Sequence, residues 1–141
     1  MPPRYPVNAA NSSKPILPTL REIAETTGDY PVEAFEFVQS GLAYAVTRVH
    51  GEKLPAGQTR HVSGQQLCDA LREYALARWG LLARPVLRGW GITQTLDFGR
   101  IVFAMVKAGL LRTTEGDSLE DFRGVFDFAS LDADYRIECR I

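Results

Sequence analysis

Few side chains in this sequence have the type and spacing that catalysis requires. His61 stands two residues before Ser63, but no G-x-S-x-G sequence surrounds the serine, so a hydrolase pair is not indicated. Cys68 falls on the expected inward face of a helix, where a thiol usually acts as a small buried hydrophobic group. We therefore assign no catalytic residue, and we expect His61 to be a solvated loop histidine.

Metal-binding chemistry is equally weakly indicated. Glu115, Asp117, Glu120 and Asp121 lie close together but lack the D-x-[DN]-x-[DN]-G order of a calcium loop. The chain has two cysteines and two histidines, which show no zinc-ligand spacing and argue against a disulfide framework. We expect a solvated acidic loop and predict no metal and no cofactor.

Charge is distributed unevenly along the chain, although the net charge is only -1. Residues 60–112 contain eight Lys or Arg against three Asp or Glu, whereas residues 113–141 contain three against eight. A basic middle with an acidic end indicates either a nucleic-acid face or two parts of one fold that neutralise each other, and we favour the second. For the first reading, the candidate phosphate contacts are Arg72, Arg78, Arg84, Arg88 and Arg100, with Trp90 as a stacking group.

Length and composition indicate one globular domain. A chain of 141 residues that is 45% hydrophobic and 23% charged is long enough and apolar enough to bury its own core. Residues 1–18, rich in proline, asparagine and serine, are expected to form a mobile lead-in, and residues 19–141 the domain. No apolar run reaches the length of a membrane span and the N-terminus lacks a signal-peptide pattern, so we predict a cytoplasmic protein without membrane contact.

Capping signals and apolar periodicity predict the helices. Thr19 with Glu22, and Ser63 with Gln66, form capping boxes at two helix starts. Pro31 suits the first turn of the helix expected at residues 31–50. The predicted helices cover 19–28, 31–50, 63–80, a short stretch near 85–89, and 95–108, the last capped by Thr93 or Thr95 and stopped by Gly109.

The segment 97–111 (DFGRIVFAMVKAGLL) is either a recognition helix or the buried centre of the domain. Apolar residues occupy most of its circumference, and only Asp97, Arg100, Ala104 and Lys107 form a narrow stripe suited to solvent. A helix that is apolar on nearly all sides is normally buried. Gly99 fits that view, because a glycine inside a helix often marks the close approach of another element. We predict a central buried helix.

Strands are expected after this helix. Residues 110–113 and 125–128 are predicted to pair, and the alternating sequence YRIECRI at 135–141 is typical of a half-buried strand. The predicted fold class is therefore α+β: a predominantly helical core around the central helix with a small antiparallel sheet. A winged helix, whose last helix enters the DNA groove, is the alternative.

The segment of about residues 30–128 resembles a family of small uncharacterised bacterial proteins. The resemblance rests on three phrases, YPVEAFEFVQSGLAYAVTRVHG, RHVSGQQLCDALREYALARWGLLARPVLRGWGI and DFGRIVFAMVKAGLLRTTEGDSLEDFRGVFDF. It implies a bacterial, cytoplasmic protein, and it carries over no substrate, cofactor or catalytic residue.

Three functions remain open at this point. A non-catalytic interaction or adaptor domain, with a protein partner or self-association, is favoured because no acid/base, nucleophile or metal constellation is evident. A nucleic-acid-binding or ribosome-associated protein is the first alternative. An enzyme is the second, and it would require His61, Asp97 and Arg100 to converge in one pocket. The sequence leaves open whether the protein binds a small molecule.

Overall fold

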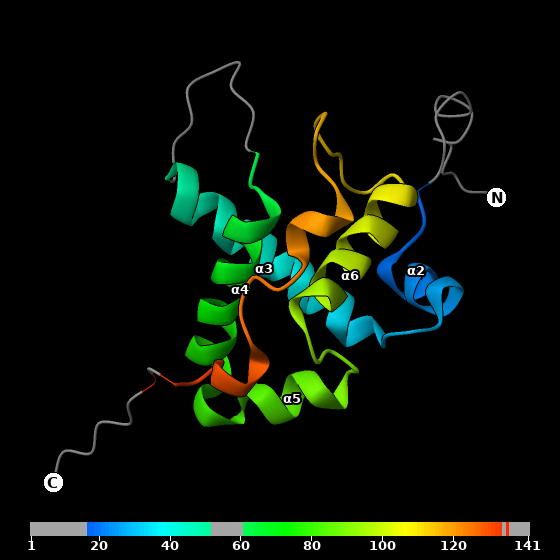
Figure 1. Ribbon diagram of the computed structural model, residues 1–141. Helices are drawn as coiled ribbons and strands as arrows, with labels where there is room; N and C mark the ends of the chain where they lie inside the picture. The colour runs from blue at the N-terminus through cyan, green and yellow to red at the C-terminus, as the bar shows by residue number, and fades with distance from the viewer. Residues whose placement is uncertain (1–16, 52–60, 134, 136–141) are drawn as a thin grey trace, which may run out of the picture.

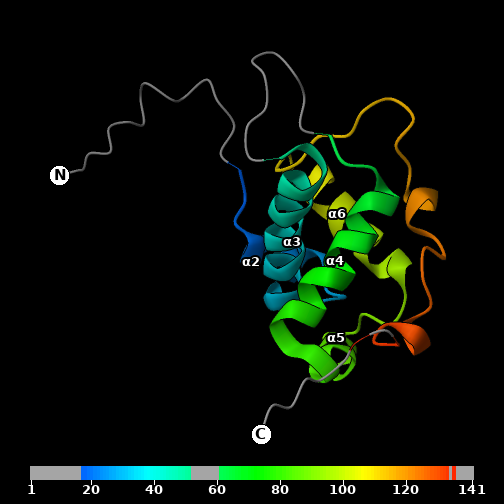
Figure 2. The same ribbon diagram turned by 90° about the vertical axis from the view of Figure 1, so that its left-hand side faces the viewer.

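The computed structural model describes residues 17–51, 61–133 and 135. Within them the elements are α2 (Leu20–Thr27), α3 (Val32–His50), α4 (Gly64–Trp79), α5 (Ala83–Gly89) and α6 (Thr95–Lys107), with the short 3-10 helices η1 (Gly80–Leu82), η2 (Leu119–Phe122) and η3 (Phe128–Ser130). Helices α3 and α4 pack along each other, α2 and α6 pack on α3, and α5 lies across one end of α4 (Figures 1 and 2).

The helix starts follow the capping signals. The capping boxes of Thr19 with Glu22 and of Ser63 with Gln66 are both formed, which confirms two predicted starts. Pro31 is the N-cap of α3, so this helix begins one residue later than predicted. Gln94 is the N-cap of α6, its amide donates to the carboxylate of Asp97 at 3.2 Å, and neither predicted threonine cap is used.

Helix α6 is the buried centre of the fold, as predicted. Its buried residues are Thr95, Leu96, Asp97, Phe98, Gly99, Ile101, Val102 and Met105. The close approach expected at Gly99 is also confirmed, because η2 lies directly against it. The placement of Asp97 on a solvent stripe was wrong: its side chain is only 5% exposed.

The predicted α+β class is wrong, and so is the winged-helix alternative, since the described residues contain no strand. Residues 110–113 do not pair, because Gly109 ends α6 in a left-handed turn and the amide of Leu110 donates back to the carbonyl of Met105. The amide of Val125 donates to the hydroxyl of Thr95 at 3.1 Å rather than to a neighbouring strand. Of the third predicted strand, 135–141, all but Tyr135 lies outside the described residues.

The segment predicted as sheet instead forms an irregular layer fastened to the helices. Phe122 is buried beside α6, and its carbonyl accepts a 2.6 Å hydrogen bond from Thr95. Phe128 contacts Phe98 at a ring-centroid distance of 5.9 Å. A short apolar run that packs against helices in this way has the same sequence pattern as a strand. No helix among the described residues is both long enough and apolar enough to span a membrane.

Candidate functional site

Aromatic side chains from α3, α4 and the turn after α5 gather in one cluster at the protein surface. We call it the aromatic surface and define it by Phe37, Tyr44, Tyr74, Trp79 and Trp90. Phe37 is its buried centre, with ring-centroid distances of 5.6 Å to Tyr74, 5.2 Å to Trp79 and 5.8 Å to Trp90. Trp79 and Trp90 meet edge to face at 5.5 Å and are both partly exposed. These are the only two tryptophans of the chain.

The helix geometry explains why these rings meet. Tyr74 and Trp79 lie on α4 where it packs against Phe37 of α3. The turn that follows α5 then brings Trp90 back to the same place, and it is fixed by a hydrogen bond from the Trp90 amide to the carbonyl of Leu87. The aromatic surface therefore depends on the packing of three separate elements.

Charged groups border this cluster. The guanidinium carbon of Arg78 lies 5.6 Å from the ring centroid of Tyr74 and 5.5 Å from that of Trp79, a cation–π arrangement. Glu33 and Glu36 are on α3 and help to line a pocket of about 190 Å³ over the rings. Neither glutamate forms an ion pair with the part of the chain that the structure describes. The pocket thus combines aromatic faces with two carboxylates.

At its far edge the aromatic surface is held by a polar bridge between α3 and α4. The hydroxyl of Tyr44 donates to Glu73 at 2.9 Å, and the same carboxylate pairs with Arg48 at 2.9 Å. The hydrogen bond to Glu73 raises the pKa of Tyr44 above its ordinary value. This bridge keeps Tyr44 against Tyr74, at a ring-centroid distance of 5.6 Å.

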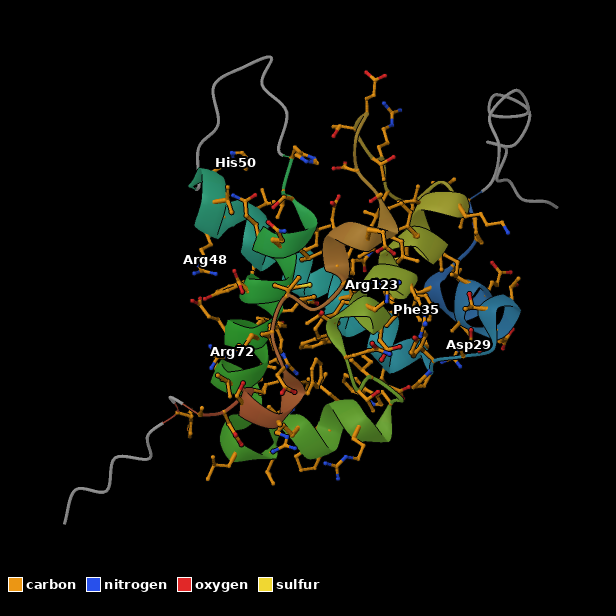
Figure 3. All side chains as sticks on the ribbon, in the orientation of Figure 1. Asp29, Phe35, Arg48, His50, Arg72 and Arg123 are labelled. Carbon is orange, nitrogen blue, oxygen red and sulfur yellow. The ribbon has the colours of Figure 1, made fainter. Side chains whose placement is uncertain are left out.

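A second pocket, of about 220 Å³, lies where α3, α4 and α6 meet the segment after α6. His61 and Asp117 are at its rim, with 3.5 Å between Nε2 and Oδ1. The side chain of His50 donates to the carbonyl of His61 at 2.6 Å (Figure 3 labels His50). The pocket floor is apolar and includes Leu67 and Phe122.

The polar groups of this second pocket have structural partners. Burial acts to raise the pKa of Asp117, but hydrogen bonds from the amide and hydroxyl of Thr114, with the nearby His61, lower it overall. Ser63 uses its hydroxyl oxygen to cap α4. Cys68 is fully buried, and desolvation raises the pKa of its thiol to about 12. No activated nucleophile therefore accompanies His61 among these groups.

Asp97 is the centre of a third cluster. Its carboxylate accepts hydrogen bonds from the Tyr30 hydroxyl at 2.5 Å and from the amides of Thr93 and Gln94 at 2.9 and 3.2 Å, and Arg100 pairs with it at 3.0 Å. Desolvation, reinforced by the bond to Asp97, raises the pKa of Tyr30 to about 12.

This third cluster therefore fixes the start of α6 and ties it to the segment that precedes α3. Asp97 and Arg100 are brought together as the enzyme hypothesis requires, but His61 belongs to the other cluster with Asp117. Within the described residues no group of His, Cys, Asp or Glu is arranged to hold a metal ion.

The structure disperses the residues predicted to contact nucleic acid. Arg72 donates from α4 to the carbonyl of Leu131 at 2.8 Å, which ties the acidic end of the chain to the helices (Figure 3). Arg78 and Trp90 belong to the aromatic surface and its border. Arg100 pairs with Asp97.

Two of the predicted contacts do share a location. Arg84 and Arg88 lie on α5, four residues apart, and line one pocket of about 230 Å³ between α5 and η3. Sequence reasoning named them, and it also named Arg78 and Trp90, but it did not identify the aromatic surface as a unit. The available signal was the type of residue, because Arg78, Trp79 and Trp90 stand at or near helix ends.

Comparisons of the chain with protein-family models, curated proteins and solved structures gave no match.

Proposed function

We propose that the protein is a non-catalytic interaction domain that binds a partner protein through the aromatic surface. The observation that carries this proposal is that both tryptophans, Trp79 and Trp90, lie partly exposed together, with Arg78 stacked beside them. Tryptophan, tyrosine and arginine are the residue types most enriched at the energetic centres of protein interfaces. A cytoplasmic location is part of the proposal.

The neighbouring exposed residues extend the apolar area. Leu81 and Leu82 follow Trp79 closely in η1 and are 48% and 64% exposed. Exposed apolar side chains that lie together can mark a protein-interaction site. We include Leu81 and Leu82 in the proposed interface because they closely follow Trp79 in the chain.

The carboxylates beside the rings indicate which type of side chain the partner presents. Glu33 and Glu36 add two carboxylates beside rings whose faces carry negative potential, so a basic side chain is favoured in the pocket over the rings. Arg78 already occupies the faces of Tyr74 and Trp79 in this manner. We therefore propose a partner that inserts a lysine or arginine next to Trp90.

Site-specific photo-crosslinking in cells tests the proposal. A photoreactive residue replaces Glu36 at the aromatic surface, and the matched control replaces the exposed Glu115 in the segment between α6 and η2. The expected result is one protein that crosslinks from position 36 and not from position 115. The purified partner should then change the intrinsic tryptophan fluorescence, which comes only from Trp79 and Trp90 if the partner lacks tryptophan.

Charge reversal completes the experiment. The double variant Glu33→Lys/Glu36→Lys should weaken binding of the purified partner at least ~10-fold, because two attractive carboxylates become repulsive. Glu115→Lys should leave binding unchanged. Equal crosslinking from both positions, or unchanged affinity of the double variant, would refute the proposal.

A further inference from the structure

Two arginines, Arg84 and Arg88, line one pocket that includes no residue of the aromatic surface. The pocket lies between α5 and η3, at the end of the molecule where these elements lie close together (Figures 1 and 2). Arg84, Arg88, Thr93 and Asp127 are its polar lining residues, over the apolar side chains of Ile92 and Phe128. Its volume is about 230 Å³.

The helix spacing places the two cations side by side. Residues four apart on an α-helix are neighbours on its surface, so Arg84 and Arg88 face the same pocket from successive turns of α5. Among the described residues neither arginine has an ion-pair or hydrogen-bond partner within the chain. Two like charges that line one pocket and have no ion-pair partner in the described part of the chain favour an anion between them.

We propose that this pocket binds a single phosphate group of a small ligand. A guanidinium presents parallel N–H donors that match the oxygens of a phosphate, and two guanidinium groups can engage one phosphate from two sides. The hydroxyl of Thr93 is exposed at the same pocket and supplies a further donor. The apolar floor formed by Ile92 and Phe128 suits an organic body attached to the phosphate.

The positions of the other arginines favour one phosphate over a nucleic-acid backbone. Tight binding to a polyanion requires several cations that follow successive phosphates. Arg72 is bonded to the Leu131 carbonyl, Arg78 lies against aromatic rings, and Arg100 pairs with Asp97. Of the five arginines considered, only the two of α5 are brought together, which is the set that one phosphate needs.

Asp127 provides a test of the ligand's charge. Its Oδ1 accepts the amide of Ala129 and so caps η3, and its carboxylate is more than 4 Å from either guanidinium, beyond ion-pair distance. A carboxylate in the lining repels a bound phosphate. Asparagine can accept the same capping hydrogen bond without the charge, so Asp127→Asn should strengthen phosphate binding while η3 is preserved.

The experiment is a titration of isotope-labelled protein with inorganic phosphate and with pyrophosphate at low ionic strength, followed by amide NMR shifts. We expect saturable shifts in α5 and at residues 127–129. Arg84→Gln and Arg88→Gln should each weaken binding about 10-fold, the order expected for one charged hydrogen-bonding partner. Arg123→Gln is the matched control, because Arg123 is already paired with Glu120 at 2.9 Å.

Several outcomes would overturn the proposal. These are the absence of saturable shifts, an equal loss in the Arg123 control, and weaker phosphate binding by Asp127→Asn. A duplex DNA or single-stranded RNA that binds more tightly than pyrophosphate, with a salt dependence steeper than two phosphate contacts allow, would replace the single-phosphate site with a nucleic-acid face. None of these readouts depends on the aromatic surface, so the two proposals fail or stand separately.

Discussion

The close packing of η2 against Gly99 of α6 can be tested by a single substitution. A Cβ atom placed there would lie 2.7 Å from Cγ and 2.8 Å from Cβ of Phe122, and 2.9 Å from Cδ1 of Leu119. The two Phe122 atoms are at the root of the side chain and cannot swing away. Gly99→Ala would therefore force η2 off α6 as a unit.

Whether Gly99→Ala lowers or raises the free energy of unfolding distinguishes this packing from an open helix face. Overpacking a core costs ~1–3 kcal/mol, and the better helix propensity of alanine returns ~1 kcal/mol. Because the Phe122 atoms cannot give way, the cost should fall in the upper part of that range. We expect Gly99→Ala to lower the free energy of unfolding by about 1–2 kcal/mol, as measured by urea denaturation.

Gly89→Ala is the matched control. Gly89 is also a helical glycine, but nothing lies within 4 Å of the position that a Cβ atom would take there. Alanine at this position should leave stability unchanged or raise it by ~0.4–1 kcal/mol. If Gly99→Ala proved as stable as the wild type, or as favourable as Gly89→Ala, the contact between η2 and α6 would be refuted.

Three further predictions concern the core and its ionisable groups. Phe98→Ala should cost ~3–5 kcal/mol of unfolding free energy because Phe98 is fully buried, whereas Phe103→Ala should cost less, because that ring is partly exposed; equal losses in urea denaturation would contradict this ranking. The raised pKa of Tyr30, about 12, means that the folded state keeps a proton that the unfolded chain loses near pH ~10, so stability should fall as the pH rises from ~10 to ~12. Tyr30→Phe should remove that part of the decline, and an identical pH profile would refute the assignment. In a Cys139→Ser background, a thiol reagent should modify Cys68 only after urea unfolding, since its pKa is raised to about 12, and rapid modification of the native protein would show that the thiol is accessible.

The parts of the fold that were predictable from the sequence are those fixed by local interactions. A capping box is completed within four residues, so Thr19 and Ser63 mark their helix starts whatever surrounds them. The burial of α6 was predictable because its apolar residues cover most of its circumference. Asp97 was misplaced because its partners Tyr30 and Arg100 include one that is 67 residues away in the sequence.

The strand predictions failed for a related reason. A short apolar run is equally suited to pairing with a strand and to packing on helices, and the choice depends on what the backbone amides bond to. In this chain the Val125 amide donates to the Thr95 hydroxyl, and the Leu110 amide donates to the carbonyl of Met105 in the last turn of α6. Both acceptors are in position only once α6 has formed, so the local sequence pattern does not reveal these hydrogen bonds.

The two proposed sites differ in how far the sequence indicates them. Arg84 and Arg88 are four residues apart on one helix, so their shared face was predictable, and only the pocket beside η3 required the structure. The aromatic surface joins side chains from α3, α4 and the turn after α5, and the pattern of each helix alone assigns its rings to the core. Partial exposure is what separates these rings from core residues, and it is a tertiary property. Because Trp79 and Trp90 both belong to this cluster, their fluorescence is a direct measure of whether it is covered by a partner.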